Sequence, residues 1–329
     1  MNYVALNRRR FIGAMAAGSA MLGVGRAAYA DELPKTMRFV VSYTPGGASD
    51  SLARALATGL ANRTQNVVIT ENKPGAGGLV AMQATKTAPP DGSVLFTSSA
   101  ASIIQSLDPE NGVHLERDFE PVMITHRGHF TLFVNADLPV TSLAELIAYD
   151  KANPGKLSYA SFGMGGQSHL AMELLKQKTG MTLTHVPYKS NAETVASVLK
   201  GETQVSLNPY TGLKQHIDAG KLRALAVTSQ EPSDFAPGVP SMKEAGVDDY
   251  EVTFWFGVNA PAGTPRQTLD RLNRELNVVL LEPTAQSVIR NQFGAATLGG
   301  TREDFARIID SELKMYGDLI RSANLDLKG

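Results

Sequence analysis

Short apolar runs alternate with segments of helical periodicity through the first third of the chain after residue 37. β-Branched runs of this kind, separated by amphipathic helices, are typical of a parallel sheet covered by helices on both faces. We therefore predict an α/β fold for this part. The strands are expected at 38–43, 67–69, 93–97 and 121–125, and the helices at 51–60 and 79–86.

A second series of the same kind begins after residue 129. Ser142 and Glu145 have the spacing of a helix capping box, and Gly180, Gly201 and Gly220 each follow a helical segment. These cycles are sufficient for a second, smaller α/β domain. The strands are expected at 131–134, 157–160, 183–186, 204–207 and 222–228, and the helices at 142–151, 170–178, 192–199 and 213–219.

The last third of the chain begins with a proline-rich surface connection at 231–246, followed by a strand at 254–258. Thr264 and Pro265 are expected to be the N-cap and first residue of a run of helices without strands of their own. Those helices should dock on the first domain, so the chain would cross twice between domains and form a two-strand hinge. The predicted division is 31–130 with 257–329 as domain 1 and 131–256 as domain 2.

The first thirty residues have the pattern of an export signal. Arg8 and Arg9 lie in a run of three arginines followed by Phe11, then comes an apolar stretch, and the segment ends in the small-x-small pattern before Ala30. An uncleaved membrane anchor is the alternative, but the apolar stretch is shorter than the ~20 residues needed to span a bilayer. We predict a twin-arginine signal cleaved after Ala30, which would place the mature protein in the periplasm.

Charge and cysteine content narrow the class of protein. The chain has 31 basic and 32 acidic side chains, and four of the arginines lie in the predicted signal, which leaves 27 against 32 and a net charge of −5. Such a net negative charge is not typical of nucleic-acid-binding proteins, which have an excess of basic residues. The absence of cysteine excludes disulfides, thiolate metal sites and a cysteine nucleophile. We expect a soluble mature monomer that relies on its own hydrophobic core.

Two segments repeat one device, in which a strand, a glycine-rich turn and a helix start follow one another. The first glycine loop is residues 43–50 (YTPGGASD) and the second glycine loop is residues 162–169 (FGMGGQSH). Glycine lets the backbone approach a ligand closely, and the start of a helix offers unpaired N–H groups and a partial positive charge. Each loop is therefore a candidate anion site.

Seven motifs in order resemble the Bug family of solute receptors, the binding components of tripartite tricarboxylate transporters. The resemblance implies a type II-like two-lobed periplasmic binding protein, each lobe a mostly parallel sheet flanked by helices, with the ligand cleft between the lobes. It also implies a small carboxylated solute held by backbone amides and hydroxyls, an inner-membrane permease as partner, no cofactor and no catalysis. The motifs are VSYTPGGASDSLAR (41–54), VITENKPGAGG (68–78), PPDG (89–92), ANPGKLSYASFGMGGQSHL (152–170), HVPYK (185–189), LRALAVTS (222–229) and APAGTP (260–265).

The candidate ligand-binding residues come from the two glycine loops and from the ends of neighbouring strands, where open α/β sheets bind ligands. They are Tyr43, Pro45, Gly46, Gly47, Ala48, Asp50, Ser98, Ser99, Phe162, Gly163, Gly165, Gln167, Ser168, His169, Tyr188, Ser190, Asn191 and Asn208.

Several of these residues have a structural alternative. Asp50 could instead complement the dipole of the helix that it begins, His169 could be a structural donor, and Ser98 or Ser99 could cap the next helix. Trp255 could line the cleft or lie in the hinge core. Two positions depart from the family pattern, because Ser190 stands where a glycine is usual and Ser206 where an aspartate is frequent. That aspartate is a candidate partner for a ligand ammonium, so its absence favours a plain mono- or dicarboxylate.

Other classes of protein remain as alternatives. An exported α/β hydrolase or transferase would need a nucleophile beside a base, but Ser168 and His169 are adjacent on a helix and point about 100° apart. No GxSxG motif is present. The six histidines are scattered, so we expect no metal site, and the glycines at 75–78 lack the third glycine of a dinucleotide motif. A sensory receptor that docks on a membrane sensor kinase is a further alternative.

Overall fold

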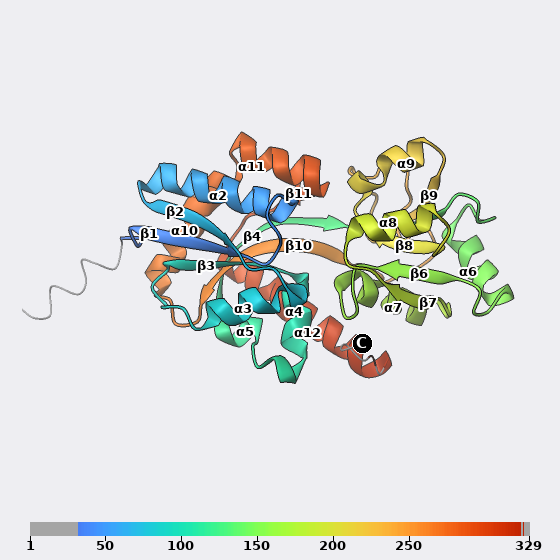
Figure 1. The fold of residues 1–329 in the computed structure, drawn as a ribbon, viewed down its shortest axis with the longest axis horizontal. Helices are drawn as coiled ribbons and strands as arrows, with labels where there is room; N and C mark the ends of the chain where they lie inside the picture. Colours follow the sequence, from blue (N-terminus) through green and yellow to red (C-terminus); the bar gives the residue numbers. More distant parts are fainter. Residues whose placement is uncertain (1–31, 324, 326–329) are drawn as a thin grey trace, which may run out of the picture.

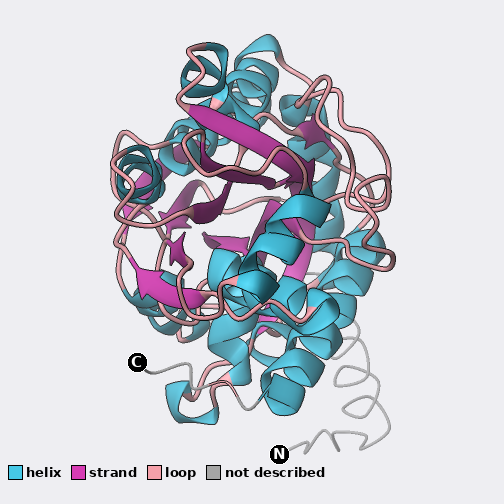
Figure 2. Cartoon of the chain, turned by 90° about the vertical axis from the view of Figure 1, so that its right-hand side faces the viewer, coloured by secondary structure: helices cyan, strands magenta, loops and turns pink. Residues whose placement is uncertain are grey.

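Two β-sheets lie side by side along the long axis of the molecule, and helices cover both (Figure 1). The computed structural model describes residues 32–323 and residue 325, so the predicted signal and its cleavage site lie outside the described residues. In the view along the long axis, the strands lie inside a surround of helices (Figure 2). The α/β class with two helix-flanked sheets is thus confirmed.

The first sheet has six strands in the order β11-β4-β10-β3-β1-β2. Helices α2, α10 and α11 pack together on one face, and α3, α4, α5 and α12 on the other. The strands are β1 (Thr36–Val41), β2 (Val67–Asn72), β3 (Val94–Ser99), β4 (Phe119–His129), β10 (Thr253–Pro261) and β11 (Ala296–Thr297). The helices are α2 (Ala48–Thr64), α3 (Leu79–Lys86), α4 (Ala100–Leu107), α5 (Leu115–Asp118), α10 (Arg266–Leu280), α11 (Pro283–Val288) and α12 (Arg302–Ala323), with short turns η1 (Ala76–Gly78), η2 (Pro109–Asn111) and η4 (Ile289–Phe293).

The second sheet has five strands in the order β7-β6-β8-β5-β9. Helices α8 and α9 lie on one face, and α7 packs on the other. The strands are β5 (Thr131–Asn135), β6 (Ser158–Ser161), β7 (Thr184–Pro187), β8 (Val205–Asn208) and β9 (Leu222–Val227). The helices are α6 (Leu143–Ala152), α7 (Gln167–Thr179), α8 (Asn191–Leu199) and α9 (Lys214–Asp218), with the short turn η3 (Tyr210–Gly212).

Each sheet contains a parallel unit of three strands, β2-β1-β3 in the first and β7-β6-β8 in the second. The remaining strands are antiparallel to their neighbours: β10 to β3 and β4, β11 to β4, and β5 to β8 and β9. The sheets are therefore mixed rather than mostly parallel. The reason is that β4 leads out of the first sheet and β10 leads back into it, so these paired strands must run in opposite directions.

The chain passes twice between the two sheets, and one threonine, Thr228, is hydrogen-bonded to both connecting segments. The chain leaves the first sheet at Phe130, between β4 and β5, and returns between residues 228 and 253. Phe130 donates its N–H to the Thr228 hydroxyl oxygen over 2.9 Å, and that hydroxyl donates to the Val252 carbonyl over 2.6 Å. Thr228 is fully buried. The crossings thus lie side by side and share hydrogen bonds.

The C-terminal helices pack on the first sheet and also reach the second. Helix α10 lies on α2 and β4, whereas α12 lies on β4 and α4 and contacts α7, where Gln177 donates to the Ser322 hydroxyl over 3.1 Å. The prediction that Thr264 caps α10 is wrong. Its hydroxyl donates to the Pro261 carbonyl over 2.7 Å and closes the preceding turn, and Pro265 is the N-cap residue.

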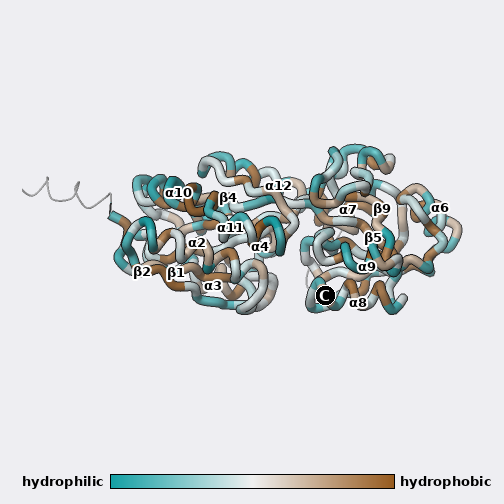
Figure 3. The backbone as a smooth tube through the Cα atoms, turned by 90° about the horizontal axis from the view of Figure 1, so that it is seen from above, coloured by the Kyte–Doolittle hydropathy of each residue, from teal (hydrophilic) through white to brown (hydrophobic). Residues whose placement is uncertain are grey.

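Apolar segments run through the interior of both halves, and polar segments lie mainly on the outer loops (Figure 3). One buried cluster passes through both sheets by way of Phe130 and Phe254, whose ring centroids are 5.3 Å apart. A separate small cluster around Phe133, Val198 and Leu213 lies beneath α8 and α9. Among residues 32–323, no helix is long and apolar enough to cross a membrane.

Candidate functional site

The first glycine loop joins β1 to the start of α2. Gly46 has φ of +86°, a left-handed conformation that favours glycine, and Gly47 is the N-cap residue of α2 with φ of −80°. Both glycines are exposed, and no side chain caps the helix. Pro45 is also exposed, and Ala48 is the first residue of α2. The start of α2 therefore presents backbone N–H groups that a ligand oxygen can accept from.

Asp50 is directed back into the first glycine loop. Its Oδ2 atom accepts from the Gly46 N–H over 3.0 Å and from Arg54 Nε over 2.9 Å, while Oδ1 accepts from Asn72 Nδ2 over 2.9 Å. The Asp50 side chain is 5% exposed. The hydrogen bond from Arg54 lowers the pKa of Asp50 to about 2. These contacts hold the loop and the first turn of α2 in place. Arg54 remains charged, but the Asp50 carboxylate balances its positive charge.

The second glycine loop joins β6 to α7 and is held by its own side chains. Gly163 and Gly165 have φ of +127° and +62°, and the N-cap residue Gly166 leaves α7 without a side-chain cap. The Ser168 hydroxyl accepts from the Phe162 N–H over 3.1 Å, and His169 Nδ1 accepts from the Gly165 N–H over 3.1 Å. Ser168 and His169 therefore bond to different backbone groups and not to each other. Such a pair has no catalytic geometry.

Three aromatic rings are stacked behind the second glycine loop. The ring centroids of His169 and His185 are 4.0 Å apart, and those of His185 and Tyr159 are 4.8 Å apart. His185 Nε2 lies 2.6 Å from the hydroxyl of Ser161, which donates to the Gly163 carbonyl over 3.0 Å. Burial lowers the pKa of His185 to about 4 and lowers that of His169 as well. The stack is therefore neutral at pH 7 and supports the loop without adding positive charge.

The two serines at the end of β3 have different roles. Ser99 is the N-cap residue of α4 and forms a capping box with Ser102, so the capping alternative is confirmed for Ser99. Its hydroxyl also lies 3.0 Å from the Tyr43 hydroxyl in the first glycine loop. Ser98 is fully buried, and its hydroxyl donates to Asn259 Oδ1 over 2.5 Å.

Gln167 connects the start of α7 to strand β10, whereas Trp255 of β10 packs away from the glycine loops, against α12. The Gln167 amide donates to the Thr253 carbonyl, which ties the start of α7 to the first residue of β10. Trp255 is fully buried, donates from Nε1 to Glu312 Oε2 over 2.7 Å, and packs with its ring centroid 5.3 Å from that of Phe305. Trp255 thus lies in the core between β10 and α12.

The remaining candidates lie at the ends of β7 and β8. Tyr188 donates its N–H to the Ser161 carbonyl, and Ser190 is the N-cap residue of α8, accepting from the Glu193 N–H over 3.3 Å. The Ser206 hydroxyl is buried and donates to the Ala160 carbonyl over 2.8 Å. Ser206 thus faces the neighbouring strand β6.

Asn191 and Asn208 line one cavity of about 410 Å³. Its wall comes mainly from α8, η3 and α9, and Gln292 of η4 contributes from the side of the first sheet. No Lys, Arg, Asp or Glu lines it.

Topology brings the candidates to two facing edges. The parallel strands β1 and β3 end at the first glycine loop and at the two serines, whereas β7, β6 and β8 end at Ser190, the second glycine loop and Asn208. Strands β1 and β6 point toward each other from the two halves (Figure 1). The sequence reasoning missed Asn72 and His185 as supports of the loops, and it missed Gln292. The HVPYK motif was the only signal for His185 and the VITENKPGAGG motif the only one for Asn72, and no motif included Gln292. No group of three or more metal-ligating side chains occurs within residues 32–323.

The fold and these two uncapped helix starts define a two-sheet α/β protein with the features of a solute receptor. A family model described as "TctC: Tripartite tricarboxylate transporter family receptor" matches residues 52–325, and the chain belongs to this family. The resemblance to Bug proteins is confirmed by this family together with the relatives BugT and BugD.

Curated relatives extend over almost the whole chain. Protein BugT of Bordetella pertussis is 31% identical over 327 residues, which are 98% of this chain and 100% of BugT. The UPF0065 protein in the tcbD-tcbE intergenic region of Pseudomonas sp. (strain P51) is 33% identical over 96% of this chain and 94% of its own length.

Solved structures agree with the fold. The periplasmic binding protein BugD is 31% identical with a TM-score of 0.75 and covers 88% of this chain and 98% of its own. R. palustris Rpa4515 with adipate is 30% identical with a TM-score of 0.75 and covers 88% of this chain and 97% of its own. MatC from Rhodopseudomonas palustris with bound malate, at 23% identity and a TM-score of 0.74, shares the fold.

Proposed function

We propose that this chain is a periplasmic receptor that binds a small mono- or dicarboxylate between its two halves and delivers it to a permease of the tripartite tricarboxylate type. The observation that supports this most directly is the pair of glycine loops, each ending at a helix start without a side-chain cap. The ligand-bearing relatives point the same way, since Rpa4515 was solved with adipate and MatC with malate.

In this proposal one carboxylate is held by backbone N–H groups of α2 and α7 when the halves close. Hydrogen bonds to a charged group contribute ~1.5–3 kcal/mol each, so three or four of them support micromolar binding after the cost of ordering. Arg54 is paired with Asp50, and the histidine stack is neutral, so the loops hold the anion with dipoles and not with a formal charge.

The receptor has no chemistry of its own in this proposal. Residues 32–130 and 253–323 form one lobe and residues 131–252 form the other. The predicted boundary at 256/257 is moved because β10 begins at Thr253 and pairs with β4 of the first sheet. The paired crossings at Phe130 and Thr228 are the hinge. In a thermal-shift screen of small carboxylic acids, the acids that bind should raise the melting temperature of the protein comprising residues 31–329. The bound acid should be recovered chemically unchanged; its turnover would instead favour the hydrolase alternative.

Location and partner are tested separately. Substitution of both Arg8 and Arg9 by lysine should retain the protein in the cytoplasm if the signal is of the twin-arginine type. Pull-down with the closed, ligand-bound form should recover a permease, and recovery of a membrane sensor kinase would favour the sensory alternative.

A further inference from the structure

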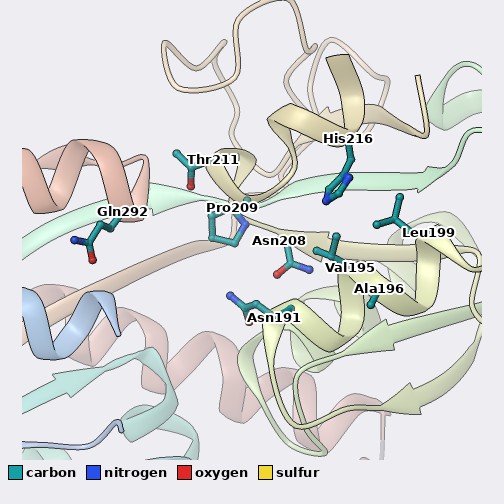
Figure 4. A pocket seen from close by; sticks show the side chains of 11 residues that line it. Asn191, Val195, Ala196, Leu199, Asn208, Pro209, Thr211, His216 and Gln292 are labelled. Carbon is teal, nitrogen blue, oxygen red and sulfur yellow. The ribbon is translucent and has the colours of Figure 1, made fainter. Parts of the chain in front are cut away.

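The two halves also touch beside the chain crossings, where η3 of the second half meets η4 of the first. Thr211 of η3 projects toward the end of η4 that carries Gln292 (Figure 4). Turn η3 follows β8, which pairs with β5, and η4 with Gly294 precedes β11, which pairs with β4. Since β4 and β5 flank the first crossing, this contact lies next to the hinge, but no chain segment passes through it.

Thr211 and Gly294 are too close for a side chain to lie between them. A Cβ atom added at Gly294 would lie 2.5 Å from Thr211 Cγ2 and 3.5 Å from Thr211 Cβ. Carbon atoms in favourable contact are about 3.5–4.0 Å apart. Gly294 also has φ of +60°, a left-handed conformation that favours glycine. The bare backbone of Gly294 therefore allows the two halves to meet at this point.

The halves are packed more firmly on the other side of the crossings. Helices α7 and α12 meet there, on the side of the crossing strands opposite to α9 and α11 (Figure 1). Leu170 of α7 is fully buried in one cluster with Phe305 and Tyr316 of α12. Thr211 and Gln292 are instead exposed, and a cavity of about 410 Å³ lies beside them. Buried apolar surface stabilises a contact, so the contact between η3 and η4 is the one that separates at lower cost.

We propose that Thr211 and Gly294 form the closing contact of the receptor, which is made when the halves close on a ligand and is broken when they open. This rests on the proposed function, in which a carboxylate is held between the halves. A rotation about the paired crossings at Phe130 and Thr228 can separate η3 from η4 while Leu170 keeps its place beside α12. Gly294 is thus a positioning residue, which acts on the ligand only through the closed arrangement of the halves.

A disulfide can test this contact, because the chain has no cysteine of its own. In the variant that combines Thr211→Cys with Gly294→Cys, the two Cβ atoms would be 3.5 Å apart when the contact is made. The Cβ atoms of disulfides are typically about 3.5–4.5 Å apart. The bond can therefore form in the closed arrangement and not in one where η3 and η4 have separated.

The measurement is the rate of disulfide formation in the purified variant with diamide as oxidant, with and without a carboxylate. The probe is the acid that binds the wild type most tightly, by calorimetry, among adipate, malate, succinate and hexanoate. A saturating concentration should raise the rate at least about fivefold, because the ligand shifts the population toward the closed arrangement. Once the disulfide has formed, release of the bound acid should be at least about tenfold slower than from the reduced variant.

The matched control combines Gly92→Cys with Thr268→Cys. Gly92 also has a positive φ, of +85°, and a Cβ atom there would lie 2.6 Å from Thr268 Cγ2, but both residues belong to the first half. The acid should not change the rate of disulfide formation in this pair.

A second pair combines Thr211→Cys with Gln292→Cys and leaves Gly294 intact. Both side chains are exposed, so a short bis-maleimide can join the two thiols across the boundary. This pair keeps the test available if a cysteine at position 294 prevents folding. The acid should accelerate its cross-linking as well.

The outcomes separate this inference from the function on which it rests. An acid that binds but leaves both cross-linking rates between the halves unchanged would overturn the inference alone, and so would an equal acceleration in the control pair. Failure of a broad panel of carboxylates to bind the wild type would overturn the proposed function, and the inference with it.

Discussion

His169 Nδ1 accepts a hydrogen bond of 3.1 Å from the backbone N–H of Gly165, so a neutral imidazole fixes the second glycine loop. A protonated imidazole carries a hydrogen on both nitrogens and cannot accept this bond. The adjacent His185, stacked at 4.0 Å, would add a second positive charge on protonation. Protonation of His169 would therefore break the hydrogen bond that holds Gly165 in the loop.

We predict that the free energy of unfolding falls as the pH is lowered from about 6.5 to about 4. Burial lowers the pKa of His185 to about 4 and of His126 to about 3, and it also lowers the pKa of His169. In this window the unfolded chain binds more protons on these histidines than the folded chain does. Each of them adds a slope of up to about 1.4 kcal/mol per pH unit, measurable by urea unfolding across the window.

His169→Asn is the matched variant for this dependence, because the asparagine side-chain oxygen can accept from Gly165 and does not titrate. The dependence of the free energy of unfolding on pH should become less steep by up to about 1.4 kcal/mol per pH unit, the contribution of one proton. The contributions of His185 and His126 should persist. An unchanged slope in this variant would show that His169 does not titrate between the folded and unfolded states in this range.

Glu312 acts in the opposite direction. This carboxyl is 6% exposed and accepts from Trp255, and burial raises its pKa to about 7. Since the folded pKa lies above the unfolded value, its stabilising effect is present at pH 4–5 and is lost as the pH rises through 7. Glu312→Gln keeps an acceptor for Trp255 and removes the titration.

Glu312→Gln should therefore raise the free energy of unfolding at pH 8 by about 1–3 kcal/mol and change it little at pH 5. Urea unfolding at the two pH values measures the difference. An equal effect at both would mean that Glu312 does not change its charge on folding.

The contact between Asp50 and the Gly46 N–H gives a prediction for the first glycine loop. Asp50→Asn removes a buried carboxylate that accepts from three donors, so the protein should lose about 1–3 kcal/mol of stability and bind its carboxylate more weakly. Asp218→Asn is the control, because Asp218 forms an exposed pair with Lys214, and exposed pairs contribute little. Equal stability losses in the two variants would contradict a supporting role for Asp50.

Most helices and strands could be predicted from sequence, because the hydrophobic periodicity and the capping residues that indicate them lie within the element itself. Ser142 caps α6 by accepting from the Glu145 N–H over 3.2 Å, as the spacing indicated. The antiparallel direction of β10 was not predictable from its own residues, since it follows from the return of the chain between two sheets. The hydroxyl of Thr264 closes a turn, an alternative that competes with capping and that spacing does not distinguish.

The glycine loops were found from sequence, but the side chains that hold them were assigned mostly to the ligand. Asp50 meets Asn72 only because β1 and β2 are paired, with Val41 opposite Asn72. Tyr159 and His185 stack because they are register partners in β6 and β7. Pairing of strands distant in sequence sets these contacts, and no local spacing encodes it.

Calorimetric titration of the wild type and Gly47→Val with the tightest-binding carboxylate tests the central claim most directly. Gly47 has φ of −80°, and a Cβ atom there would meet only the Thr44 carbonyl at 3.8 Å, so the backbone can accommodate valine. The valine side chain would, however, lie in front of the helix start where the carboxylate is proposed to bind. Thr58→Val, on the exposed surface of the same helix, is the control. Loss of two hydrogen bonds to the carboxylate predicts at least ~100-fold weaker binding by Gly47→Val with an unchanged melting temperature. Affinity within about threefold of the wild type would contradict binding at this loop.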